Sequence, residues 1–153
     1  MRRLAVMVLA SVAVAWCDAK PAEFVVAGLG LGLTPPQIVA ILGQPSQQNR
    51  VTDRLSAWKY SQPSAKLTLS IWNGVLTTIQ AQGKWSLQLE GKSLPAYGAS
   101  TDEVRAAFGP PSETGDALRG KDWWTYQRHN QKLSFHFEGG HVSEFGLTML
   151  ELP

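Results

Sequence analysis

The sequence KLTLSIWNGVLTTIQ, residues 66–80, decides the fold, and it has a counterpart in KLSFHFEGGHVSEFG, residues 132–146. In each stretch, apolar and polar residues alternate before an Asn-Gly turn at residues 73–74 or a Gly-Gly turn at residues 139–140. Alternation at period two is typical of a half-buried strand, and both dipeptides favour the tight turn of a β-hairpin. Both stretches therefore predict antiparallel strands with one apolar face on a core.

The two stretches belong to a longer internal repeat. A shift of 66 residues aligns residues 32–80 with residues 98–146 without a gap, and ten of the 49 positions are identical. Similarity at a fixed shift indicates a duplicated structural unit. The identical pairs that bear most on the fold are Gly32/Gly98, Gly43/Gly109, Pro45/Pro111, Trp58/Trp124 and Tyr60/Tyr126.

A short helix is expected ahead of the strands in each unit, at residues 35–42 and 101–108. Each begins with a capping box, in which two side chains satisfy the free N–H groups of the first turn. Gly43 and Gly109 follow the last apolar residues and are expected to end the helices at positive φ. The capping pairs are Thr34 with Gln37 and Ser100 with Glu103.

These elements predict an α+β fold of two tandem helix-plus-antiparallel-sheet repeats, with the helices packed on one face of the sheet or sheets. The repeats are assigned to residues 20–90 and 91–153, and residues 85–91 are expected to add a fourth strand to the first. Leu76 and Ile79 are both apolar but three residues apart, which predicts a β-bulge. Whether the repeats share one continuous sheet stays open.

The N-terminus has the layout of a secretory signal peptide at residues 1–19. Two arginines precede about twelve apolar residues, a run too short to span a membrane. The chain is therefore expected to be exported, to the periplasm or the cell exterior, with cleavage after Ala15 or Ala19. Cys17, the sole cysteine, is an alternative lipidation site, which Trp16 before it disfavours. No disulfide can form within the mature chain.

Charge and residue types argue against several functions. The formal net charge of +2 becomes +1 without residues 1–19, too near neutral for a nucleic-acid-binding surface. Of the glycines at residues 28, 30 and 32, only Gly32 recurs in the second unit, where Leu94 and Ala96 replace the other two, so a phosphate-binding loop is not expected. The histidines are His129, His136 and His141, with no cysteine or carboxylate cluster beside them. We therefore expect no enzyme activity, no metal and no cofactor.

The shared motifs Gly-x-Thr/Ser-x-x-Gln/Glu, Leu/Phe-Gly-x-Pro-Ser, Trp-x-Tyr and Lys-Leu-Thr/Ser resemble those of the BamE-like (SmpA/OmlA) envelope lipoproteins. The tandem arrangement is similar to that of the secreted beta-lactamase inhibitor proteins. The first resemblance implies a non-enzymatic, exported protein-binding module of envelope or outer-membrane assembly, peripherally associated with the outer membrane. The second implies the alternative, a secreted inhibitor of an enzyme. Neither identifies the partner or the oligomeric state.

Strand parity divides the tryptophans between two environments. Residues 67, 69 and 71, with 133, 135 and 137, form the apolar inward set, and Trp58 and Trp124 are expected in the core. The opposite face would carry four residues as a hypothetical partner-binding patch: Lys59, Trp72, Trp123 and His136. The alternative is that the two outer tryptophans are buried by the other unit or by a terminal segment.

Overall fold

The computed structural model describes residues 23–117 and 121–153; the predicted signal peptide, both cleavage sites and Cys17 lie outside these residues. In chain order the elements are β1 (Phe24–Val26), α1 (Pro35–Leu42), β2 (Gln47–Arg50), β3 (Leu55–Gln62), β4 (Ala65–Trp72), β5 (Val75–Gln82), β6 (Leu87–Leu89), β7 (Lys92–Ser93), α2 (Thr101–Phe108), β8 (Glu113–Ala117), β9 (Lys121–Arg128), β10 (Gln131–Glu138) and β11 (His141–Met149).

The strands form one large and one small sheet. The large sheet has eight strands in the order β2-β3-β4-β5-β11-β10-β9-β8, and every neighbouring pair is antiparallel. The small sheet has the order β1-β6-β7. Consecutive strands are joined by short hairpins on either side of the centre, whereas β5 and β11 meet across a long stretch of chain.

The predicted fold class is wrong. The described chain is mostly β, with two helices of eight residues each, and it does not form two tandem helix-plus-sheet repeats. Strand β5 pairs with β11 over five positions, from Gln82↔Glu144 to Thr78↔Thr148, so one sheet runs through both halves. This pairing satisfies backbone groups that two separate sheets would each leave exposed at an edge.

Three further strand assignments differ from the prediction. Strands β2 and β8 form the outer edges of the large sheet where polar loops were expected. The strand expected at residues 85–91 is β6, but it pairs with β1 and β7 in the small sheet rather than extending the first unit. The all-exposed residues of β2 have no apolar alternation, because neither of its faces lies on the core.

The helix and strand ranges nevertheless correspond between the halves. Helices α1 and α2, β3 and β9, and β4 and β10 have bounds that differ by 66 residues, and both helices lie at the predicted positions. In α2, Ser100 N donates to Glu103 Oε2 at 2.8 Å and Glu103 N donates to Ser100 Oγ at 3.3 Å. In α1, Thr34 N donates to Gln37 Oε1 at 2.9 Å.

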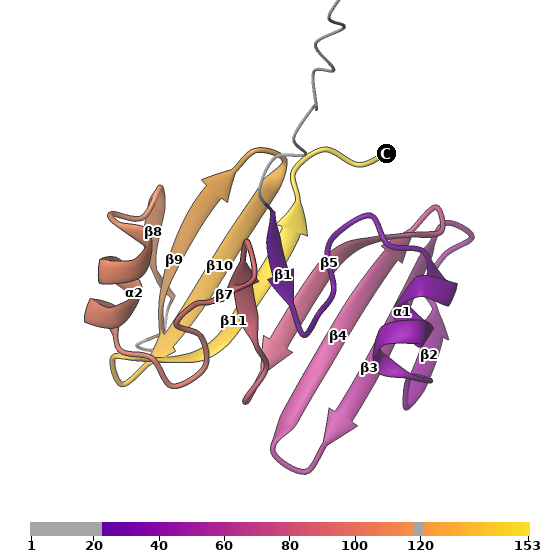
Figure 1. Cartoon of the computed structure of the whole chain (residues 1–153), viewed down its shortest axis with the longest axis horizontal. Helices are drawn as coiled ribbons and strands as arrows, with labels where there is room; N and C mark the ends of the chain where they lie inside the picture. Colours follow the sequence, from indigo (N-terminus) through magenta and orange to yellow (C-terminus); the bar gives the residue numbers. More distant parts are fainter. Residues whose placement is uncertain (1–22, 118–120) are drawn as a thin grey trace, which may run out of the picture.

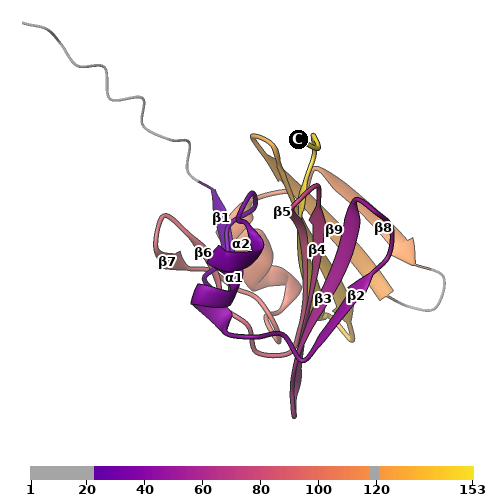
Figure 2. The same cartoon turned by 90° about the vertical axis from the view of Figure 1, so that its right-hand side faces the viewer.

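One hydrophobic core lies between the large sheet and a layer of α1, the small sheet and α2. Figure 2 shows both helices and the small sheet on the same side of the large sheet. In Figure 1 the small sheet lies between the two helices. Ile38 of α1 and Val104 of α2 are fully buried. The predicted inward set is buried too: Leu67, Leu69, Ile71, Leu133, Phe135 and Phe137.

The Trp-x-Tyr motif contributes to this packing and ties each helix end to the sheet. Tyr60 Oη donates to Gly43 O at 3.0 Å, and Tyr126 Oη donates to Gly109 O at 3.3 Å. Burial raises the pKa of both tyrosines. Trp58 is buried, as predicted. Trp124, its counterpart in the second half, was also predicted in the core but is only partly buried.

The turns and bulges follow the sequence closely. Gly43 and Gly109 have φ of 77° and 78°, which confirms the predicted positive φ, although their extended ψ places them outside the left-handed helical region. The predicted bulge occurs in β5, where Thr77 is the extra residue opposite the step from Ser70 to Ile71 of β4. An equivalent shift follows His136 in the second half. Each extra residue donates its hydroxyl across the bulge: Thr77 Oγ1 to Ser70 O and Ser143 Oγ to His136 O, both at 3.2 Å.

Candidate binding face

The face of the large sheet that points away from the core is called the open face below. Among the described residues, no helix or strand packs over it, and Figure 2 shows the other elements on the opposite side. Its residues come from alternate positions of the strands, because successive side chains of a strand point to opposite faces. Both halves of the chain contribute equally to it through the β5–β11 pairing.

Strand register arranges the open face in rows that cross the sheet. One row contains Ser61, Lys66, Gln82, Glu144, His136 and Trp123, each paired with the next, and it is called the edge row below. A second row contains Lys59, Thr68, Gln80, Gly146, Ser134 and Thr125. A third contains Ala57, Ser70, Thr78, Thr148, Lys132 and Gln127. Serine, threonine, glutamine and lysine occupy five of the six positions in each of the second and third rows and three of the six in the edge row.

The four residues predicted to bind a partner lie on this face but not together. His136 and Trp123 are a cross-strand pair at one end of the strands. Trp72 lies at the opposite end of β4, where it pairs with Leu55 and Val75. Four strand spacings and six residues separate Trp72 from Trp123, roughly 25–30 Å. Lys59 pairs with Thr68 on the second row. The predicted patch is therefore three separate places on one face.

Both outer tryptophans are partly buried rather than fully exposed. The indole of Trp123 lies against the backbone of Gly115 on β8, and a Cβ added to Gly115 would overlap the ring. The corresponding pair in the first half is Asn49 with Ala57. The second half thus combines a large aromatic residue with a neighbour that has no side chain, which leaves room for the ring.

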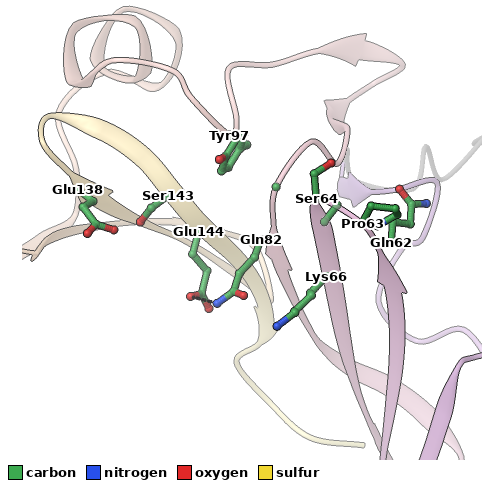
Figure 3. Close-up of a pocket in the computed structure, with 11 residues that line it drawn as sticks. Gln62, Pro63, Ser64, Lys66, Gln82, Tyr97, Glu138, Ser143 and Glu144 are labelled. Carbon is green, nitrogen blue, oxygen red and sulfur yellow. Dashed lines mark hydrogen bonds between the residues drawn. The ribbon is translucent and has the colours of Figure 1, made fainter.

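A cavity of about 430 Å³ lies where the two halves meet, beside the middle of the edge row. Figure 3 shows Gln82 and Glu144 directed toward one another, with Lys66 alongside them and Tyr97 across the gap. Gln82 Nε2 donates to Glu144 Oε2 at 2.9 Å. Tyr97 is 46% exposed. The hairpin turn between β3 and β4 forms another wall, at residues 62–65.

A polar cluster lies at the other side of the open face. Glu113 Oε2 accepts a hydrogen bond from Thr125 Oγ1 and lies 3.3 Å from Lys132 Nζ. Thr125 is almost completely buried although it belongs to the open face. The ion pair is partly exposed, so we expect it to contribute little to stability.

Possible metal ligands lie apart from one another within residues 23–117 and 121–153. No group of three or more His, Cys, Asp or Glu side chains in these residues could hold a metal ion. His141 pairs with Glu138 across the hairpin, and its Nδ1 lies 3.1 Å from Gly139 O. Within the same part of the chain, no helix has the length and apolar character needed to cross a membrane.

Sequence reasoning missed Gln82, Glu144, Gly115 and Tyr97. Gly115 could have been found by comparing the two halves, since the exchange of Asn49 for Gly115 accompanies that of Ala57 for Trp123. Gln82 and Glu144 come together only through the β5–β11 pairing, which the sequence pattern does not indicate.

Comparison with known proteins identifies similar folds. No family model matches the chain, and no curated protein matches it. An extracellular protein containing a SCP domain from Bacillus anthracis matches with a TM-score of 0.58 and 12% identity, over 78% of this chain and 44% of that one. A cysteine-rich secretory protein from Staphylococcus aureus matches with a TM-score of 0.57 and 10% identity, over 78% and 43%. The chain spans less than half the length of these two proteins.

A DUF4309 family protein from Bacillus subtilis matches with a TM-score of 0.52 and 13% identity, over 76% of this chain and 78% of that one. A candidate beta-lactamase inhibitor protein from Streptococcus mutans matches at 14% identity with a TM-score of only 0.33, which carries no argument about fold. At such identities the first three similarities show a shared fold alone. They give no support to the expected BamE-like family or to an outer-membrane location.

Proposed function

We propose that the chain is an exported, non-enzymatic module that binds a partner protein through the open face. The observation that carries this proposal is the size of the uncovered face. Eight strands, the longer ones of eight or nine residues, present roughly 850 Å² on one side of the sheet. A protein–protein interface of standard size buries about 800 Å² on each partner.

The contrast between the two faces supports the same proposal. Between the two halves most core positions keep their apolar character, with Ala65 against Gln131 as an exception. Several open-face positions differ, although Lys66 and Lys132 are identical: Ala57 against Trp123, Ser70 against His136, and Trp72 against Glu138. A duplicated unit must keep the residues that fold it and is free to change where it contacts a partner. The partly exposed Trp72 is of a residue type often found as a binding hot spot.

Export rests on the sequence of residues 1–19 and agrees with the matched structures, two of which are described as extracellular or secretory proteins. The alternative function is a secreted inhibitor of an enzyme, which would use the same face. The identity of the partner separates these two, since an inhibitor binds a soluble enzyme and an envelope module binds a component of the membrane or cell surface.

Site-specific photo-crosslinking in cells that export the chain tests the proposal. A photoreactive amino acid would replace Gln80 or Thr148 on the open face, and Ile41 or Asp102 on the exposed sides of the helices as matched controls. We expect one partner protein to be crosslinked from both open-face positions and from neither helix position. Crosslinking of that protein from the helices alone, or no crosslink from the open face, would refute the proposal.

A further inference from the structure

We propose that the edge row is a binding site for a linear, neutral oligosaccharide. This inference goes beyond the proposed protein-binding function and assigns a second class of ligand to one margin of the open face. It rests on the order of side chains along the row, on the contact of Trp123 with Gly115, and on the cavity at the seam, the name used below for the line where β5 pairs with β11.

The row places planar polar groups side by side across the seam. Gln82, Glu144 and His136 occupy three adjacent strands and provide an amide, a carboxylate and an imidazole. Lys66 precedes them and Trp123 follows them. Sugar hydroxyls both donate and accept hydrogen bonds, and a mixture of amide, carboxylate and imidazole groups can satisfy both roles.

Trp123 provides an apolar surface at the end of this polar series. Its indole rests against the backbone of Gly115 at the edge of the sheet and remains partly exposed. A sugar ring has one face rich in C–H groups, which packs on the electron-rich face of an aromatic ring. Tyr97, 46% exposed, lines the seam cavity together with Gln82.

The length of the edge row and the charges of its residues restrict the class of ligand further. Lys66 and Trp123 are four strand spacings apart, roughly 19 Å, which suits a chain of several sugars rather than a single sugar. The one lysine and one glutamate of the row carry opposite formal charges. A neutral chain therefore meets no net charge along the row.

The composition of the row favours a sugar over a protein at this position. Cores of protein interfaces are enriched in aromatic residues, Met and Arg and depleted in Lys, Glu and Ser. The row contains Ser61, Lys66 and Glu144. Among the described residues, none of the well-exposed large hydrophobic side chains belongs to the row: Ile41, Val51, Tyr97, Leu150 and Leu152. A polar site with one or two aromatic surfaces fits a hydroxyl-rich ligand better.

Titration of the full mature chain with defined sugars tests the assignment. The probes are cellohexaose, maltohexaose and the β-1,4-linked hexamer of N-acetylglucosamine, followed by ¹H–¹⁵N NMR of the backbone and indole groups. We expect at least one hexamer to shift the resonances of Gln82, Glu144, His136 and Trp123. The corresponding disaccharide is expected to bind about tenfold more weakly or worse, because it covers only part of the row.

Single substitutions test which residues of the row form the site. Trp123→Ala is expected to weaken binding about tenfold or more, as an aromatic anchor does. Gly115→Ala keeps the tryptophan but displaces its ring, so it should weaken binding as well. Trp72→Ala is the matched control, since it removes an open-face tryptophan outside the row, and it should leave sugar binding unchanged.

Three results would overturn the inference. The first is no shift of the row resonances by any hexamer at millimolar concentration, and the second is equal weakening of sugar binding by Trp72→Ala and Trp123→Ala. The third is a Trp123→Ala variant that loses crosslinking to the partner protein but keeps sugar binding. The last result would assign the row to the partner protein. Crosslinking from Gln80 and Thr148 is measured outside the row, so failure of the sugar site and failure of the proposed function remain distinguishable.

Discussion

Replacing Phe135 by alanine should destabilise both halves of the molecule together. Phe135 is fully buried on β10, and its ring centroid lies 5.3 Å from that of Phe108, 6.0 Å from Tyr126, 6.3 Å from Phe145 and 6.4 Å from Phe137. A residue surrounded by other aromatic rings leaves a cavity that cannot easily collapse. The expected cost is therefore about 3–5 kcal/mol, a large part of a total stability of about 5–15 kcal/mol.

Urea unfolding followed by tryptophan fluorescence measures this loss. With a slope of about 2 kcal/mol per molar urea, the midpoint should fall by about 2 M. His136→Ala, a change at the next residue on the open face, is the control and should move the midpoint by a small fraction of that. Amide hydrogen exchange then shows whether the destabilisation extends from the second half to the first, across the β5–β11 pairing.

Because one core joins the halves, the amide of Leu69 on β4 should lose as much protection in the Phe135→Ala variant as that of Phe145 on β11. Two separate unfolding transitions, or unchanged protection of Leu69, would refute the single cooperative core. Either outcome would mean that the two halves fold as separate units despite sharing a sheet.

Three further changes test local features of the structure. Hydrogen bonds from Ser100 hold the pKa of Glu103 below its ordinary value of 4.5, so the stability that this carboxylate contributes is present above that pH and is lost as the pH falls through the lowered pKa. Glu103→Gln should therefore lower the urea midpoint at pH 7, and the difference from the wild-type midpoint should shrink toward pH 3. Gly83→Ala should cost more than about 1 kcal/mol, because the residue has φ of 83° and a Cβ there would overlap the backbone of the β3–β4 turn; an unchanged midpoint would contradict this. Gln131→Leu should cost about 1–3 kcal/mol, since Phe24 N, which donates to Gln131 Oε1 at 2.7 Å, loses its buried acceptor; a more stable variant would show that the unpartnered Gln131 Nε2 dominates instead.

The features predicted correctly are those that depend on nearby residues. Helix positions follow from the capping boxes and from Gly43 and Gly109, and the hairpins follow from alternation around the turns. Each of these signals lies within about ten residues of the element that it specifies. The internal repeat helped because the same local signals occur twice.

The arrangement of the halves could not be predicted in the same way. The pairing of β5 with β11 joins residues more than 60 positions apart, and both strands have the alternation of any half-buried strand. The short edge strand β2 consists of exposed polar residues, so it has no apolar pattern to distinguish it from a loop. The expected two-repeat fold therefore failed where long-range pairing, rather than local pattern, determines the structure.

The candidate site shows the same limit. Parity correctly placed Lys59, Trp72, Trp123 and His136 on one face, because side-chain direction alternates along each strand. It could not show that Trp72 and Trp123 lie at opposite ends of the strands. Their separation depends on the register of five strands and on the seam between the halves.

The affinity of the crosslinked partner for two arginine variants tests the central claim most directly. Thr148→Arg places a large charged side chain at the centre of the open face, and Ile41→Arg places the same side chain on the exposed side of α1. Both positions are exposed, so both variants should fold with a nearly unchanged urea midpoint. We expect Thr148→Arg to weaken partner binding by about tenfold or more and Ile41→Arg to leave it unchanged. Unchanged partner binding in Thr148→Arg, together with weaker partner binding in Ile41→Arg, would contradict a binding site on the open face.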